Sequence, residues 1–92
     1  MAVLVWKHGK TNAKAIAAIK AALKEFGYAG SVTWSGSSVE ARYGPFASVV
    51  HVMGEVTDDA VVLDKCGGLA GRAVLSRCRE LLARLFPSGE EA

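Results

Sequence analysis

Apolar and polar residues alternate from Ser31 to Asp64, and this pattern limits the possible folds more than any other feature of the chain. Turn residues interrupt the alternation at 35–38, at Gly44-Pro45 and at 57–59. Short segments of period two separated by such turns are typical of antiparallel strands joined in a meander. We expect one face of this sheet to carry the apolar set Val32, Trp34, Val39, Ala41, Tyr43, Val50, Val52 and Val56.

Helical patterns lie on both sides of the meander. The first pattern predicts an amphipathic helix that begins at Thr11 or Asn12, since either residue can cap it, and that Gly27 ends. Its apolar residues, at spacings of three, four and three, are Ile16, Ile19, Leu23 and Phe26. The second pattern predicts a helix over 69–86, which Pro87 stops. Its apolar stripe consists of Val74, Leu75, Cys78, Leu81, Leu82 and Leu85.

The apolar run from Ala2 to Trp6 predicts a buried strand ahead of the first helix. The element order is then β-α-β-β-β-β-α, which predicts an α+β fold with an antiparallel sheet and two helices packed on one face. A chain of 92 residues with 51% hydrophobic residues can bury roughly two thirds of its surface. We expect a single α+β domain over residues 1–87 and a disordered tail over 88–92, because the tail has nothing to bury.

The second face of the sheet is less polar than a solvated face should be. Its central row contains Val49, His51, Met53 and Glu55, and Val62 joins it from the next strand. Exposed apolar patches often mark contact surfaces. We therefore predict an interaction surface formed by Val49, His51, Met53 and Val62, and homodimerisation through this exposed face.

Charge is distributed unevenly, although the net charge is only +2. The first 24 residues contain five lysines and no acidic residue. Such a segment is suited to phosphates or to an anionic surface, while a solvated helix face is the alternative interpretation. Arg72 follows a glycine-rich loop at the start of the second helix, where an anion could also bind. The predicted anion contacts are Lys10, Lys14, Lys20, Lys24 and Arg72.

Catalytic motifs are incomplete. Gly9-Lys10-Thr11 follows a strand and opens a helix, as the end of a phosphate-binding loop does, but Leu4 stands where that motif needs a glycine. Adjacent aspartates such as Asp58 and Asp59 are typical of a solvated hairpin turn. No serine or cysteine can be paired with His51 from the sequence, so we expect no catalytic residue and no enzyme.

Cys66 and Cys78 are the only cysteines, and their spacing does not fit a zinc site, so we expect no metal and no cofactor. Cys78 belongs to the apolar stripe and reads as a small core residue, whereas Cys66 is predicted in a loop over 66–68. The chain starts without a basic leader, and no uncharged stretch reaches the roughly 18 residues of a membrane helix. We therefore expect a cytoplasmic protein without a membrane span.

Several short motifs, considered together, suggest a family. They are His8-Gly9 before an Ala/Lys-rich helix, Trp34-Ser35-Gly36, the segment 54–59 with Val61 and Leu63 after it, and the closing helix over 77–85. In this order the chain resembles the bacterial polyhydroxyalkanoic acid system proteins, also called polyhydroxyalkanoate granule-regulatory proteins. The resemblance implies association with storage granules, and it brings no catalytic residues.

The sequence thus favours a small non-catalytic accessory or interaction protein, with a polyhydroxyalkanoate granule or a protein as its partner. The alternative is a nucleic-acid or anion-binding module that uses the lysine-rich first helix and Arg72. Nucleic acid is the less favoured partner, because Trp34 and Tyr43 share the inward side of the sheet instead of an exposed basic face. Phosphate binding would weaken steeply with salt, whereas an apolar contact would persist.

Overall fold

The computed structural model describes residues 2–92, and it confirms the predicted α+β fold and element order. A six-stranded antiparallel sheet has the strand order β2-β3-β4-β5-β1-β6. One helix precedes the β2–β5 meander in the chain, and the other follows it. The elements are β1 (Leu4–Lys7), α1 (Asn12–Glu25), η1 (Ala29–Ser31), β2 (Val32–Ser35), β3 (Ser38–Tyr43), η2 (Pro45–Ala47), β4 (Val50–Val56), β5 (Ala60–Gly67), α2 (Gly71–Leu85) and β6 (Glu90–Glu91).

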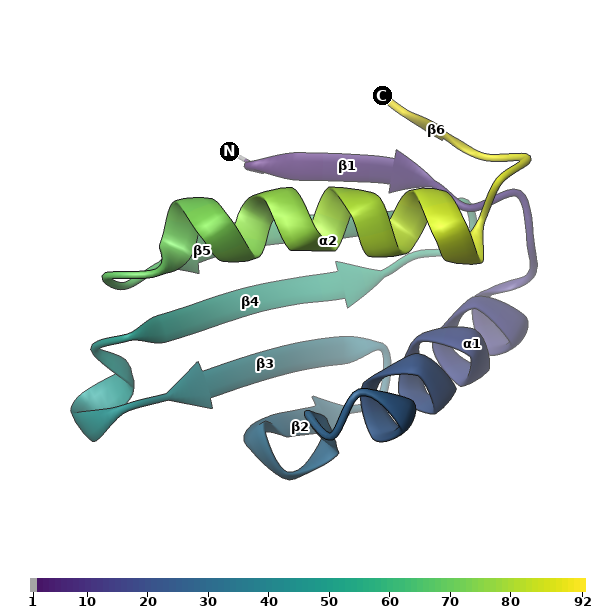
Figure 1. Cartoon of the computed structure of the whole chain (residues 1–92). Coiled ribbons are helices and arrows are strands. Elements are labelled where there is room, and N and C mark those ends of the chain that lie inside the picture. The colour runs from purple at the N-terminus through teal and green to yellow at the C-terminus, as the bar shows by residue number, and fades with distance from the viewer. Residues whose placement is uncertain (1) are drawn as a thin grey trace.

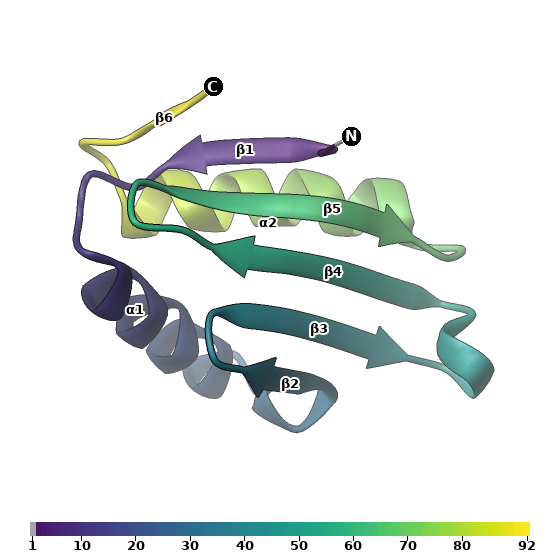
Figure 2. The same cartoon turned by 180° about the vertical axis from the view of Figure 1, so that it is seen from behind.

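Both helices lie on one face of the sheet. In Figure 1 they stand in front of the strands, and α2 lies lengthwise along β5, with further contacts to β4. Figure 2 shows the opposite side, where the strands are in front and no helix covers them. The helices therefore leave one whole face of the sheet to contact solvent or another molecule.

The core lies between the sheet and the helices, and period two decides which strand residues enter it. Alternate residues of β4 and β5 are buried there, together with residues from β1, α1 and the end of α2. The largest fully buried side chain is Phe86, which is 1% exposed. The buried hydrophobic cluster comprises Leu4, Ala15, Val52, Val56, Val61, Leu63, Leu82 and Phe86.

Helix α1 approaches the sheet through its alanines and less through the large residues of its predicted stripe. Ala15 and Ala22 are buried, and Ile16 and Ile19 are only half-buried beside them. Phe26, which the periodicity placed on the buried side, is 46% exposed. Because an alanine side chain is short, the helix axis lies close to the sheet and the larger residues spread along the sides of the contact.

The first helix begins and ends as its sequence signals predict. The Thr11 hydroxyl accepts a hydrogen bond from the Lys14 N–H at 3.2 Å, which caps the first turn. Asn12 Nδ2 donates to the Val56 carbonyl at 2.6 Å and so fixes the start of α1 to the end of β4. Gly27 takes a positive φ of 80° just after the last turn.

Three boundary predictions are wrong. The first strand spans Leu4–Lys7, and only Leu4 is fully buried; Val5 pairs with Val62 on the uncovered side and is half-buried. Cys66 lies in β5 opposite Val52, outside any loop, because β5 continues to Gly67. The tail also has structure: Glu90 and Glu91 pair with β1, so residues 88–92 are not a disordered tail.

The paired tail depends on backbone and charge contacts, since both of its strand residues are exposed. The Ala92 N–H donates to the Val5 carbonyl at 2.9 Å, and Arg79 Nε donates to the Glu91 carboxylate at 3.0 Å. Gly89 passes so close to the Lys7 carbonyl that a Cβ at this position would collide with it. Strand β6 therefore covers the part of the β1 edge that would otherwise be open.

Candidate functional site on the uncovered sheet face

Strand register determines which side chains share the uncovered face. One row runs across the sheet through Thr33, Glu40, Met53 and Lys65, and the next through Ser35, Ser38, Glu55, Val62 and Val5. Arg42 and His51 form a third, shorter row. The face therefore combines apolar residues near its middle with hydroxyl groups and charges of both signs around them.

Most of the predicted interaction surface is brought together on this face. His51, Met53 and Val62 lie on it, and Met53 is 43% exposed. Val49 does not belong to the group, because it precedes β4 and its side chain lies over Gly44. The contact surface thus lacks Val49 at the start of β4, and it gains Val5, which lies opposite Val62 on β1.

A bulge adds charge to this face. The register shifts between Met53 and Gly54, so that Met53 lies opposite Lys65 while Gly54 lies opposite Leu63, and Asp64 is the extra residue. Both Asp64 and Lys65 are exposed as a result. Gly54 is required at this point, because a Cβ there would lie only 2.7 Å from the Val62 carbonyl oxygen.

The bulge borders a shallow hollow of about 380 Å³ on the uncovered face. Met53 supplies apolar surface to the hollow, and serine and threonine hydroxyls with carboxylates supply its polar groups. Its lining residues are Thr33, Ser35, Ser38, Val39, Glu40, Met53, Gly54, Glu55, Asp64 and Lys65.

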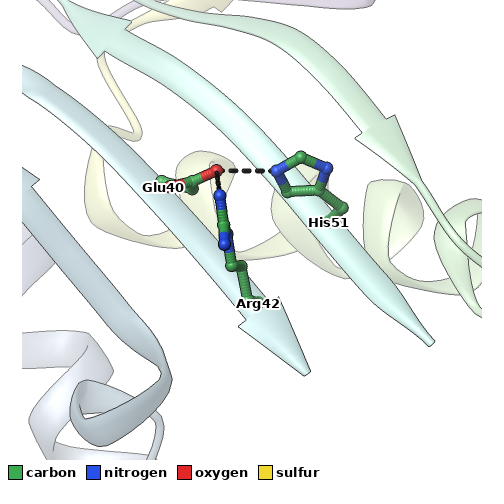
Figure 3. Close-up of polar contacts among 3 residues, drawn as sticks. All are labelled: Glu40, Arg42 and His51. Carbon is green, nitrogen blue, oxygen red and sulfur yellow. Dashed lines mark hydrogen bonds and ion pairs between the residues drawn. The ribbon is translucent and has the colours of Figure 1, made fainter. Parts of the chain in front are cut away.

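A charged cluster of three residues lies beside the hollow (Figure 3). His51 Nε2 approaches Glu40 Oε2 to 2.7 Å, and an Arg42 guanidinium nitrogen lies 3.0 Å from the same oxygen. Glu40 and Arg42 come from β3 and His51 from β4, so the pairing depends on the register of these two strands. Glu40 therefore serves as an acceptor between two donors.

Two hydrogen bonds hold the pKa of the Glu40 carboxyl below its ordinary value of 4.5, and the bond from His51 contributes more than the bond from Arg42. A lowered pKa in the folded state gives stability that is present above the ordinary value and is lost as the pH falls through the folded value. We expect Glu40→Gln to remove this dependence, so that the melting temperatures of the two proteins converge between about pH 5 and pH 3. Thermal unfolding followed by circular dichroism across this range checks it, and a difference that grows with acidity would contradict the assignment.

The adjacent aspartates Asp58 and Asp59 lie in a hairpin turn. Asp58 and Asp59 are exposed, and the Thr57 hydroxyl donates to Asp59 at 2.9 Å within the β4–β5 hairpin. The Asp59 carbonyl accepts the His8 N–H at 3.1 Å. The pair therefore shapes the hairpin and its attachment to β1, in agreement with the solvated-turn interpretation.

His8 is the residue whose role sequence reasoning missed. It is fully buried, and its Nδ1 accepts the Lys10 N–H at 3.0 Å while Nε2 lies 3.0 Å from the Thr57 carbonyl. Because Nδ1 accepts, the proton of the neutral ring is on Nε2, which donates to Thr57. The turn over Gly9-Lys10-Thr11 is thus closed by a histidine and followed by a helix cap.

The predicted anion contacts do not form one site. Lys14 and Lys24 are ten residues apart on α1, which is about 15 Å along the helix axis. Arg72 belongs to the first turn of α2, and Figure 1 shows that turn at the opposite end of the sheet from the start of α1. Lys20 and Lys24 share a hollow, which lies beside Trp34.

The glycine-rich loop before α2 uses its own N–H groups. Leu69 donates to the Ser48 carbonyl at 3.0 Å, and Ala70 donates to the Val49 carbonyl at 2.9 Å. Gly68 has a φ of 93°, and a Cβ there would collide with the Val49 carbonyl. The glycines therefore allow close packing against the start of β4, which explains them without a bound anion.

Burial disfavours the ionisation of both thiols. Burial raises the pKa of the Cys78 thiol to about 11, with a smaller contribution from Cys66, and burial also raises the pKa of Cys66. Cys66 Sγ donates to the Gly71 carbonyl at 3.2 Å. Within residues 2–92, no three histidine, cysteine or acidic side chains gather closely enough to hold a metal ion.

Comparison with protein-family models, with curated proteins and with solved structures finds no match to this chain. In the part of the chain that the structure describes, neither helix is long and apolar enough to cross a bilayer.

Proposed function

We propose that this protein is a non-catalytic accessory protein that binds through the uncovered face of its sheet, and that the partner across this face is a second copy of the chain. The observation that supports the proposal is the apolar centre of that face. Met53 is exposed there, and Val5 and Val62 are half-buried without any helix above them. Uncovered apolar surface of this kind is typical of protein contacts.

The charged cluster beside the apolar centre supports binding over catalysis. A general base works best when its pKa lies near the working pH, yet hydrogen bonds hold the pKa of Glu40 below its ordinary value. His51 is occupied by the same carboxylate at 2.7 Å. Glu40, Arg42 and His51 thus hold one another's side chains in place, and they form a polar border beside the apolar centre of the face.

Charge complementarity and size favour a second copy as the partner. The face carries Arg42 and Lys65 as well as Glu55 and Asp64, so a two-fold arrangement can place cations of one copy against carboxylates of the other. The molecule measures 35 × 23 × 21 Å. A whole face of these dimensions supplies about the 800 Å² per partner of a standard interface, so the entire sheet face is needed.

The resemblance to polyhydroxyalkanoate granule-regulatory proteins supplies a cellular setting for the proposal. It rests on the motifs around Trp34-Ser35-Gly36 and residues 54–59, which form the β2–β3 turn and the end of β4. In this setting a dimer joined through its sheets would turn both helical layers, with their lysines, toward the surroundings. The alternative is that the same sheet face binds a granule surface in place of a second copy.

We expect the wild-type chain to have the mass of two copies at tens of micromolar, and Val62→Lys to have the mass of one. Val62 lies opposite Glu55, so a lysine there can pair with Glu55 at the surface of the monomer, whereas the dimer would have to take this charged pair out of water. Light scattering after size exclusion measures the mass, and circular dichroism confirms that the variant is folded.

Leu69→Lys is the matched control, because Leu69 is a highly exposed apolar residue outside this face. It should leave the dimer intact. The dimer should also persist in 0.5 M salt, where the Debye length is ~4 Å, because its apolar centre is not screened by ions. Met53→Gln provides a second test should Val62→Lys fail to fold. A single-chain mass for the wild type, with granule cosedimentation that Val62→Lys or Met53→Gln abolishes, would replace the dimer by the granule surface.

A further inference from the structure

A second hollow, separate from the uncovered face, lies between the last turns of α1 and the edge strand β2 on the helical side of the sheet. Its volume is about 250 Å³. This is smaller than the roughly 300–1,000 Å³ of sites for drug-sized ligands, so it suits one short chain or one ring. Its lining residues are Lys20, Leu23, Lys24, Ala29, Val32 and Trp34.

The walls of this hollow are apolar. Leu23, Val32 and Trp34 are all half-buried, and Ala29 closes the end at η1. Trp34 packs against the hydrophobic core on one side and so offers a fixed surface. A ligand that enters must therefore present hydrocarbon or an aromatic ring to these walls.

The rim of the hollow is cationic. Lys20 Nζ lies 5.1 Å from the centre of the Trp34 ring, and Lys24 follows one turn later on the same side of α1. Like charges four residues apart on a helix repel each other. Among the described residues neither lysine forms an ion pair, so an anion placed between the two ammonium groups would relieve this repulsion.

We propose that this hollow binds a small amphiphilic anion, namely an unbranched carboxylate of about six to eight carbons. The alkyl chain would lie against Leu23, Val32 and Trp34, and the carboxylate would pair with Lys20 and Lys24. The inference is independent of the sheet face, since the two sites lie on opposite sides of the sheet and share no charged residue.

An oligonucleotide fits this site less well. The Trp34 side chain is half-buried, and Lys20 lies over its ring face. A stacked base would need this whole face and would have to displace the lysine, whereas an alkyl chain needs only part of the Trp34 surface. Lys14 is also poorly placed to bind a phosphate together with Lys20, because the two residues lie about 9 Å apart along the helix axis.

The test is a titration of the ¹⁵N-labelled full chain with butanoate, hexanoate and octanoate, followed by amide chemical shifts. We expect saturable shifts confined to the residues that line the hollow. Each methylene that enters should raise the affinity about four-fold. The double variant Lys20→Gln with Lys24→Gln should bind hexanoate at least five-fold more weakly, and Lys14→Gln should bind it as the wild type does.

Three probes separate the competing outcomes. Hexanol that binds as tightly as hexanoate would overturn the role of the lysines. Inorganic phosphate or a short oligonucleotide that binds as tightly would overturn the role of the apolar walls. Shifts on the uncovered face instead of around Trp34 would place any binding elsewhere and overturn the site, whatever the mass of the protein proves to be.

Discussion

Phe86→Ala should reduce the free energy of unfolding by about 3–5 kcal/mol, the usual cost of removing a large side chain from a closed core. Phe86 is 1% exposed, caps α2 through its N–H bond to the Leu82 carbonyl at 2.8 Å, and packs its ring against His8 with centroids 5.8 Å apart. In a domain of this size the loss corresponds to a fall in melting temperature of at least about 12 °C. Urea unfolding followed by tryptophan fluorescence measures it.

Phe46→Ala is the control for this prediction, because Phe46 is fully exposed, at 105% of the reference area. Its effect should stay within about 0.5 kcal/mol. Equal effects for the two phenylalanines would mean that the end of α2 is not docked as described. Such a result would also question the path of the tail, since the Gly89 N–H donates to the Phe86 carbonyl at 2.9 Å.

The meander could be predicted because period two is a strict constraint on a half-covered sheet. Val52 and Val56 point into the core, and His51 and Met53 point away from it, as their parity requires. A slip by one residue would exchange the two sets. The same parity placed Val62 on the uncovered face, so most of the proposed contact surface follows from the sequence alone.

Local signals fail where backbone pairing or close packing decides the structure. Glu90 and Glu91 carry no apolar signal, and they form a strand only because the edge of β1 offers partners. Cys66 reads as a loop residue because Gly67 and Gly68 follow it and the bulge at Asp64 shifts the alternation.

The charged cluster and the second hollow also needed the structure. Glu40 and Arg42 are outward by parity, but their approach to His51 depends on the register between β3 and β4. Lys20 lies away from the apolar stripe of α1 on a helical wheel. Its long side chain nevertheless reaches Trp34 on the neighbouring strand, as lysine stems often do.

His8 shows why a single polar residue at a strand end is hard to interpret from sequence. Its two ring nitrogens join the Lys10 N–H, two residues away, to the Thr57 carbonyl, 49 residues away. The nearer contact ties β1 to the start of α1, and the farther one ties both to the β4–β5 hairpin. Nothing in the local pattern around His8-Gly9 reveals the second partner.

His8→Leu should therefore destabilise the fold by about 2–4 kcal/mol, because it leaves the Lys10 N–H and the Thr57 carbonyl, both bonded at a partly buried corner, without their partner. His51→Leu is the matched control. It removes the partly exposed bond to Glu40, and the loss of such a surface pair should cost no more than about 1 kcal/mol.

The tautomer gives His8 a second, independent test that does not depend on whether the variant folds. Because Nδ1 accepts from Lys10, the neutral ring must carry its proton on Nε2. Nitrogen chemical shifts of a ¹⁵N-histidine-labelled sample distinguish the two tautomers. A proton on Nδ1 would contradict the bond from Lys10, and with it the explanation of how this corner joins the first strand, the first helix and the hairpin.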